Sequence, residues 1–283
     1  LGDVYKRQIE GHLFLNGKKP IQHRSSYGLG EVIKAALDNH TEHLVISLGG
    51  IGSFDGGAGM LQALGATFYD DEAQIVDMRK GAYLIKYIRR IDLSGVHPQL
   101  TKVNIQLMSD FSSRLYGKKS EIMQTYESLD LSQNEAAEID NLIWYFSELF
   151  KNELKIAMGP IERGGAGGGI AAVLNSLYQA EILTSHELVN QITHLENLIQ
   201  QADLIIFGEG LKEEDQILET TTIRIAELTQ QYSKPAIAIC ATNDKFDLFE
   251  SLNVTAMFNT FIDMPDSYTD FKMGIQIRHY TVQ

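Results

Sequence analysis

The chain has 283 residues, of which 44% are hydrophobic, enough for one large or two ordinary α/β domains with their own cores. Its formal net charge of −13 argues against a broad nucleic-acid surface, although backbone amides and a few local cations could still bind a small anion. No apolar run approaches the roughly 20 residues of a membrane span, and we expect no signal peptide. Cys240, the single cysteine, lies in an apolar run, so we expect it to be a small buried hydrophobe in a cytoplasmic protein.

The first part of the chain is predicted to alternate helices and strands. Residues 1–8 lack periodicity and do not begin with methionine, so we expect non-native residues joined to a truncated gene and exclude them from the fold. Apolar residues at helical spacing over 29–37 predict a helix, and 44–48 predict a buried strand. After a glycine-rich loop, a helical stripe over 58–64 should end at Gly65 in the C′ position.

The middle of the chain carries two further strand patterns, at 82–88 and 103–108, with a turn at Pro98 between them. Ser132 followed by Glu135 is typical of a capping box. A long helix should therefore begin at this point.

The last part of the chain is predicted to build parallel βαβ units. An amphipathic helix is expected through 188–199, after a second glycine cluster and its apolar run. Beyond it, strands and helices alternate, which favours a parallel sheet. The expected strands are 203–207, which should be buried, 236–240 and 254–262, and the expected helices are 217–228, 246–252 and one last helix at the end.

A strand, a glycine loop and a helix follow one another over 44–65, with Asp55 in the loop. This order brings bare backbone N–H groups and a positive helix end to a place where an anion could approach. Asp55 could hold Mg²⁺ or accept a substrate hydroxyl proton during phosphoryl transfer. Alternatively, its side chain only caps the helix that begins near Gly57, and the spacing alone favours this cap.

The second glycine cluster, 164–169, contains neither a P-loop nor a dinucleotide fingerprint. Its successive N–H groups could cradle phosphate oxygens, or the cluster could be a flexible connection or a tight helix crossing. Arg163, just before it, could neutralise a phosphate or be an ordinary solvated side chain.

Two further carboxylates follow predicted strands. Glu209 lies between Gly208 and Gly210 at the end of a strand, where open α/β sheets bind ligands, and this placement favours a functional role. Asp110 has a similar placement after the strand at 103–108. The eight histidines show no metal-ligand spacing.

Five stretches resemble motifs of the bacterial-type glycerate kinases. Residues 49–60, G-G-I-G-S-F-D-G-G-A-G-M, are similar to the family's G-G-S-A-T-N-D-G-G-A-G-M. Residues 26–33 resemble S-Y-G-T-G-E-L-I, and 93–100 resemble L-S-G-L-D-P-R-L. Residues 164–169 fall where the family has G-A-G-A-A-G-G, and 203–210 resemble D-L-V-I-T-G-E-G. The chain is thereby identified as a truncated, divergent member of the glycerate kinase family.

Several positions depart from these motifs. The family segment P-D-S-F-K-G-S has no counterpart, and Ile51 and Phe54 stand where the family has polar residues. Glu127 replaces a lysine, and Thr221 falls near the place of another. Lys212 could stand in for an arginine.

The resemblance implies an α/β fold of two domains, a Rossmann-like domain with a second α/β domain inserted. Residues 9–183 would be the inserted domain, and 184–283 the C-terminal half of the Rossmann-like domain, whose N-terminal half is missing. The implied reaction is ATP-dependent phosphorylation of D-glycerate to phosphoglycerate, assisted by Mg²⁺. The alternative is a catalytically impaired relative that binds an organic acid or a nucleotide.

The resemblance also implies roles for single residues. Asp55 would be the catalytic acid or metal site, with Glu209 and Asp110 as supporting carboxylates. The glycine loops would bind substrate or phosphate. The candidate binding residues are Gly49, Gly50, Ser53, Gly56, Gly57, Arg163, Gly165, Gly167, Gly168, Gly208, Gly210 and Lys212. The oligomeric state and the position of the new phosphate stay open.

Overall fold

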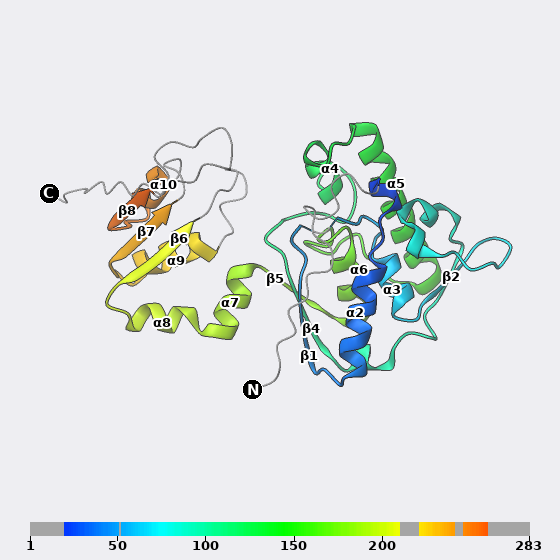
Figure 1. Cartoon of the computed structure of the whole chain (residues 1–283), viewed down its shortest axis with the longest axis horizontal. Coiled ribbons are helices and arrows are strands. Elements are labelled where there is room, and N and C mark those ends of the chain that lie inside the picture. The colour runs from blue at the N-terminus through cyan, green and yellow to red at the C-terminus, as the bar shows by residue number, and fades with distance from the viewer. Residues whose placement is uncertain (1–19, 51, 210–220, 241–245, 260–283) are drawn as a thin grey trace, which may run out of the picture. The chain divides into compact units, whose positions relative to one another are not determined.

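The protein is represented by a computed structural model, which describes residues 20–50, 52–209, 221–240 and 246–259. The chain divides into two compact units, Leu1–Leu183 and Thr184–Gln283 (Figure 1). Each unit contains helices and a parallel sheet, so the expected α/β class is confirmed. Their assignment as an inserted domain and half of a Rossmann-like domain stays a prediction.

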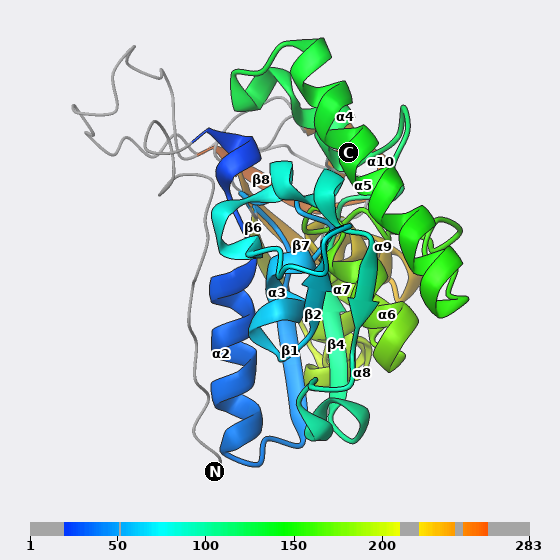
Figure 2. The same cartoon turned by 90° about the vertical axis from the view of Figure 1, so that its right-hand side faces the viewer.

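The first unit is built on a parallel sheet in the order β1-β4-β5. Figures 1 and 2 show α2 lying along β1, and α6 packs against β4 and β5. The strands are β1 (His43–Ser47), β4 (Asn104–Met108) and β5 (Glu181–Leu183), and the helices around them are α2 (Tyr27–Asp38), α3 (Ala58–Ala63) and α6 (Ile170–Tyr178). The strands expected at 44–48 and 103–108 and the helix stop at Gly65 agree with this arrangement.

A second layer of the first unit holds a two-stranded antiparallel sheet, short helices and the long helix α5. These elements are β2 (Thr67–Tyr69), β3 (Arg90–Asp92), α4 (Glu121–Thr125), α5 (Gln133–Leu154) and the 3₁₀ helices η1 (Ile21–His23), η2 (Met78–Lys80), η3 (Ala82–Tyr87), η4 (Pro98–Thr101) and η5 (Glu127–Leu129). The capping box of α5 is confirmed: Ser132 Oγ accepts from Glu135 N at 3.3 Å, and Glu135 Oε2 accepts from Ser132 N at 2.8 Å.

The strand expected at 82–88 is wrong, because this segment forms the 3₁₀ helix η3. Ala82, Ile85 and Ile88 are all buried, and their spacing of three residues matches the three residues per turn of a 3₁₀ helix. An apolar run alone does not distinguish this periodicity from that of a buried strand.

The second unit carries a parallel sheet in the order β6-β7-β8, which confirms the predicted βαβ units. Its elements are α7 (Ser185–Thr193), α8 (Leu195–Gln201), β6 (Ile205–Glu209), α9 (Thr221–Gln231), β7 (Ala236–Cys240), α10 (Phe246–Ser251) and β8 (Ala256–Asn259). The single helix expected through 188–199 is two helices, because His194 takes a left-handed conformation with φ 53° and ends α7. The expected last helix lies outside the described residues.

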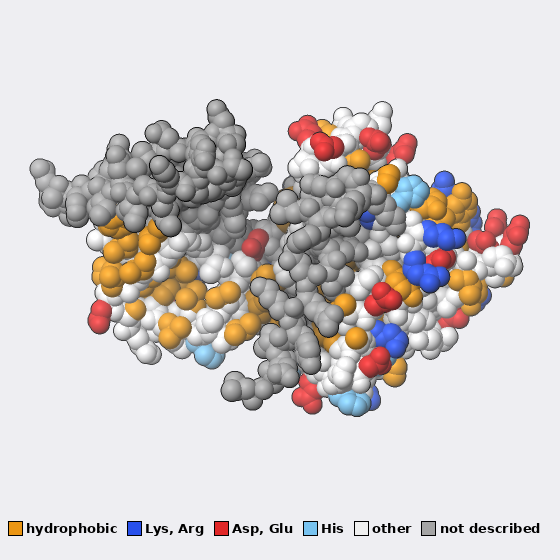
Figure 3. All heavy atoms as spheres, viewed as in Figure 1, with side chains coloured by type: hydrophobic (Ala, Val, Ile, Leu, Met, Phe, Trp, Pro, Cys, Tyr) orange, Lys and Arg blue, Asp and Glu red, His pale blue; other side chains and the backbone are white. Residues whose placement is uncertain are grey.

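Strands β1 and β6 are only half buried, contrary to the expectation of buried strands. Val45 is 52% exposed and Ile206 is 61% exposed, whereas Ile46 and Phe207 are buried. Hydrophobic side chains gather over β6 and β7 in Figure 3. Leu204, just before β6, is 47% exposed. Each strand thus has one packed face and one open face in the described part of the chain, the alternation typical of a sheet covered on one side.

Candidate functional site

The glycine loop after β1 is exposed at its start and buried at its end. Gly49 and Gly50 are exposed, and a side chain added at either would meet no atom within 4 Å. From Gly52 onward the loop is buried, and α3 begins after Gly57, whose φ is 77°. The exposed start of the loop therefore has room for a ligand, and the buried end is fixed by packing.

Asp55 lies at the buried end, and its carboxylate accepts four hydrogen bonds. Oδ2 accepts from the backbone N of Ser26 at 2.8 Å, from Ser26 Oγ at 3.0 Å and from Gly59 N at 3.1 Å. Oδ1 accepts from Gly57 N at 3.0 Å. Two of these donors belong to the first turn of α3 and two to the start of α2. The carboxylate thus ties two helix starts together.

The same contacts join two of the motifs that were quoted separately above. Ser26 Oγ donates to Asp55 and accepts from Met60 N at 2.8 Å. A Cβ on Gly30 would lie 2.4 Å from Met60 O, and a Cβ on Gly59 would lie 2.2 Å from the hydroxyl of Ser25. Glycines at these positions let α2 and α3 cross at backbone contact.

These hydrogen bonds favour the capping role that was the alternative for Asp55. Burial raises the pKa of the Asp55 carboxyl, and the hydrogen bonds from Ser26, Gly59 and Gly57 act in the opposite direction. A magnesium ion would need oxygen ligands that these N–H and O–H donors now occupy, so the described arrangement does not fit Mg²⁺ at this residue. The catalytic and metal roles of Asp55 stay predictions that require the Ser26 contacts to open.

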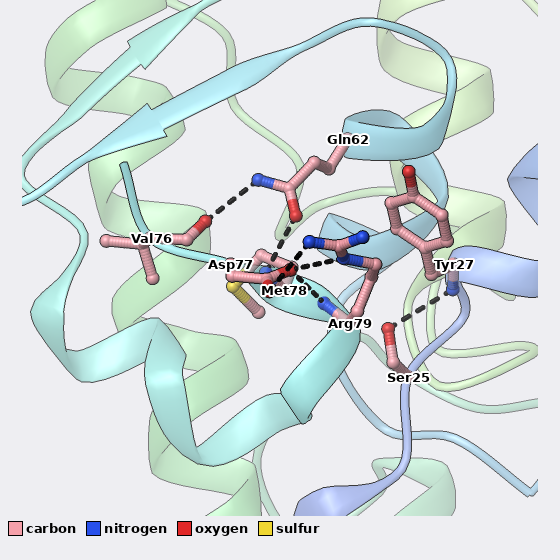
Figure 4. Close-up of polar contacts among 7 residues, drawn as sticks. All are labelled: Ser25, Tyr27, Gln62, Val76, Asp77, Met78 and Arg79. Carbon is pink, nitrogen blue, oxygen red and sulfur yellow. Dashed lines mark hydrogen bonds and ion pairs between the residues drawn. The ribbon is translucent and has the colours of Figure 1, made fainter. Parts of the chain in front are cut away.

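A second set of polar contacts links α3 to the segment around η2 (Figure 4). Gln62 Oε1 accepts from Met78 N at 2.7 Å. Arg79 pairs with Asp77 through two hydrogen bonds of 2.7 and 3.0 Å, and its guanidinium lies 5.7 Å from the ring centre of Tyr27. The start of α2, the helix α3 and the segment around η2 are therefore held as one frame.

The second glycine cluster packs against the first loop. Gly56 N donates to Gly168 O at 2.9 Å, and a Cβ on Gly168 would lie 2.1 Å from Ser53 O. A Cβ on Gly165 would lie 2.1 Å from Arg114 O. Of the three interpretations left open above, a tight crossing describes these contacts, and a phosphate-cradling role stays a prediction.

A carboxylate that the sequence analysis did not single out lies on this cluster. Glu121 Oε2 accepts from Gly168 N at 3.2 Å. Burial raises the pKa of the Glu121 carboxyl to about 7, although the amides of Gly168 and Gly167 act to lower it. The glycine amides thus already hold a carboxyl group from the protein itself.

Glu121 should make the stability of the protein depend on pH. Its pKa of about 7 lies above the ordinary 4.5, so the folded protein binds more protons than the unfolded chain between these values. The free energy of unfolding therefore falls as the pH rises through this range, by up to about 3 kcal/mol. Urea titrations from pH 4.5 to 8 should show this fall in wild type and a smaller one in Glu121→Gln.

Glu138→Gln serves as the matched control, because Glu138 is exposed on α5. This control should follow the wild-type pH curve. Equal curves for wild type and Glu121→Gln would show that the carboxyl of Glu121 does not titrate inside the folded protein.

Two buried hydroxyls flank the glycine cluster. Ser53 Oγ and Ser113 Oγ are both buried and have no hydrogen-bond partner within the described residues. Ser113 Oγ lies 2.7 Å from the position of a Cβ on Gly165. Because a buried hydroxyl without a partner costs about 1–3 kcal/mol, such groups often mark a place where a ligand or water binds.

The other predicted site residues are dispersed. Asp110 is exposed after β4, and Arg163 is partly buried before the glycine cluster with φ 56°. Gly208 is exposed near the end of β6, and the backbone of Glu209 pairs with that of Cys240. Gly210 and Lys212 lie outside the described residues. The structure brings Ser53, Gly56, Gly57, Gly165, Gly167 and Gly168 together with Asp55 and Glu121 in the first unit.

The fold thus defines a class, an α/β protein with two parallel sheets and paired glycine loops, and comparisons with known proteins give its family. The model of the glycerate kinase family matches residues 8–272, and the chain belongs to this family. It is 31% identical to a glycerate kinase of Halalkalibacterium halodurans, over 82% of this chain and 60% of the relative. It is 29% identical to a glycerate 2-kinase of Escherichia coli, over 83% of this chain and 61% of the relative.

A solved structure shows the same fold. A putative glycerate kinase 2 from Salmonella typhimurium LT2 superposes with a TM-score of 0.75 at 28% identity, over 89% of this chain and 65% of that one. The chain therefore spans about three fifths of the length of the curated relatives named above.

The described part of the chain offers no membrane-spanning helix and no cluster of metal ligands. None of the helices described is long and apolar enough to cross a membrane. No three His, Cys, Asp or Glu residues in the described ranges are grouped so that they could hold a metal ion.

Proposed function

We propose that the protein is a glycerate kinase that transfers the γ-phosphoryl group of ATP to a hydroxyl group of D-glycerate. The hydroxyl oxygen attacks the phosphorus, its proton passes to a base, and ADP and phosphoglycerate leave. Family membership over 8–272 carries this proposal, because relatives named as glycerate kinases match most of the chain. Such an activity suits the cytoplasm, where the sequence analysis places the protein.

The chain's own groups would act by binding and orientation. Gly49 and Gly50 are exposed, and a Cβ on either would meet no atom within 4 Å; their amides would meet an anionic part of a substrate. Mg²⁺ would neutralise phosphate charge during transfer. Asp55 does not fit as its ligand in the described arrangement, and Asp110, which is exposed at the end of β4, is the other predicted carboxylate of this unit.

The alternative proposal is a catalytically impaired relative that binds an organic acid or a nucleotide. Two departures from the family motifs support it. Phe54, in place of a polar residue, is buried in the hydrophobic core. Glu127, in place of a lysine, is exposed and accepts a hydrogen bond from the hydroxyl of Tyr126 at 3.1 Å. A cation that could clamp phosphate oxygens is thus replaced by a carboxylate.

An assay of the product of the complete reading frame separates the two proposals. With D-glycerate and Mg²⁺ it should consume ATP and form phosphoglycerate, weakly, because each lost transition-state contact costs about 10²–10³ in rate. It should show no NAD-linked redox activity, and glycerol, which lacks the carboxylate, should be a poor substrate. Binding of glycerate or ATP without any product would decide for the impaired relative.

A further inference from the structure

Glu121 places a carboxylate on the amides of the second glycine cluster, and the proposed reaction gives it no role. Its position follows from local pairing, because Arg114 N donates to Lys119 O at 2.8 Å and Arg114 forms a bridge with Ser120. This pairing sets the next residue, Glu121, at the start of α4 with its Oε2 3.2 Å from Gly168 N.

Successive backbone N–H groups in a turn can line a concave surface that binds anions. Residues 162–169 form a turn, in which Gly167 and Gly168 have positive φ values of 65° and 63°. We propose that Glu121 occupies this amide site in place of a ligand, and that a small anion with carboxylate or phosphoryl oxygens displaces it. Glu121 then turns into solvent. The proposal rests on the proposed function only for the identity of the natural anion.

A second, independent polar group lies on the same glycine cluster. Ser113 Oγ is buried without a partner in the described structure, and it faces the backbone of Gly165 in the same cluster. A hydroxyl there could donate to an arriving anion, which removes the cost of its unpaired state. A Cβ on Gly165 or Gly168 would collide with protein atoms, so glycine keeps this surface bare backbone.

The elements next to Glu121 carry further charged groups, but only burial, which raises the pKa of its carboxyl, and the amides of Gly168 and Gly167, which lower it, account for that pKa. Helix α5 carries Asp140, which accepts from Gly117 N at 2.8 Å and from the hydroxyl of Ser120. The paired segment carries Arg114 and Lys119, and the approach to the glycine cluster carries Arg163. Asp140 has its own donors, so it does not replace Glu121 on the glycine amides.

Proton release provides the test, because the Glu121 carboxyl has a pKa of about 7 in place and about 4.5 when solvated. Calorimetric titrations would use sulfate and D-glycerate at pH 6 and pH 8, each in two buffers of different ionisation enthalpy. Neither anion changes its charge in this range. Wild type should release about 0.9 protons per anion bound at pH 6 and about 0.1 at pH 8, and should bind about tenfold more tightly at pH 8.

Glu121→Gln should bind without proton release and with equal affinity at both pH values, whereas Glu138→Gln should behave as wild type. Proton uptake, no release or no binding of either anion by wild type would overturn the proposal, and this result needs no variant to fold. Binding of sulfate alone would assign the site to phosphoryl oxygens, and binding of D-glycerate alone to a carboxylate.

The two proposals fail separately. Phosphoglycerate formation without proton release would leave the kinase function in place and remove the role of Glu121. Proton release without phosphoglycerate formation would support the role of Glu121 and remove the proposed kinase function.

Discussion

An alanine at Gly168 should cost far more stability than an alanine at Gly50. Both glycines have left-handed backbones, with φ values of 63° and 69°. Alanine pays about 1 kcal/mol for that conformation at either place. At Gly168 the new Cβ would also lie 2.1 Å from Ser53 O, whereas at Gly50 it would meet nothing within 4 Å. We expect Gly168→Ala to lower the free energy of unfolding by about 4 kcal/mol and Gly50→Ala by about 1 kcal/mol.

Urea unfolding followed by circular dichroism measures both variants against wild type. The comparison isolates the contact, because the backbone conformation is the same at the two positions. Similar losses for the two variants would mean that the two glycine loops do not pack against each other as described.

Asp55→Ala should destabilise the protein about as much as Gly168→Ala. It removes the acceptor of four buried donors, two from Ser26 and one each from Gly57 and Gly59. An unpaired buried donor costs about 1–3 kcal/mol, so we expect a loss of about 3–5 kcal/mol after the donors partly rearrange. Asp92→Ala is the control, because Asp92 accepts from Ser94 N at an exposed turn and should leave stability nearly unchanged.

A double-mutant cycle with Ser26→Ala then tests the capping role directly. If Asp55 acts by holding Ser26, the two substitutions should be strongly non-additive. Turnover distinguishes the catalytic role from the capping role. If Asp55 transfers a proton, a folded Asp55→Asn variant of an active protein should have a kcat lowered by about 10² or more. Unchanged turnover with lowered stability would leave only the cap.

The elements that the sequence predicts well are those whose cause is local. The capping box of Ser132 and Glu135 needs only four neighbouring residues, and it is present in the structure. The strand Ala236–Cys240 agrees residue for residue with the prediction, because a short β-branched run between helices has few other solutions.

The predictions that fail depend on information from elsewhere in the chain. The apolar residues of 82–88 would suit either a buried strand or a 3₁₀ helix. The segment packs against α5, which lies far along the chain, and this packing determines which of its side chains are buried. The left-handed backbone of His194 ends α7 within a pattern that would otherwise continue as one helix. The periodicity of the side chains gives no signal of this backbone conformation, so it does not predict the break.

The candidate site shows the same limit more sharply. Asp55 is prominent in the sequence, but its partner Ser26 lies 29 residues earlier, and only the crossing of α2 and α3 brings them together. Glu121 follows Lys118, Lys119 and Ser120, so it reads as part of a solvated surface. Its contact with the glycine amides joins residues 121 and 168, which are 47 positions apart, so no local sequence pattern could predict it.

The strand order of the first unit also means that its sheet is completed late during synthesis on the ribosome. Strand β4 cannot pair with β5 until 75 more residues have been made, the separation between Gln106 and Glu181. At 5–20 residues per second this takes about 4–15 s. During that interval the outer edge of β4 lacks its neighbour, and an unpaired strand edge invites other chains. Between the synthesis of β4 and that of β5, the nascent protein would therefore be most prone to aggregation and would benefit most from a chaperone that covers this edge.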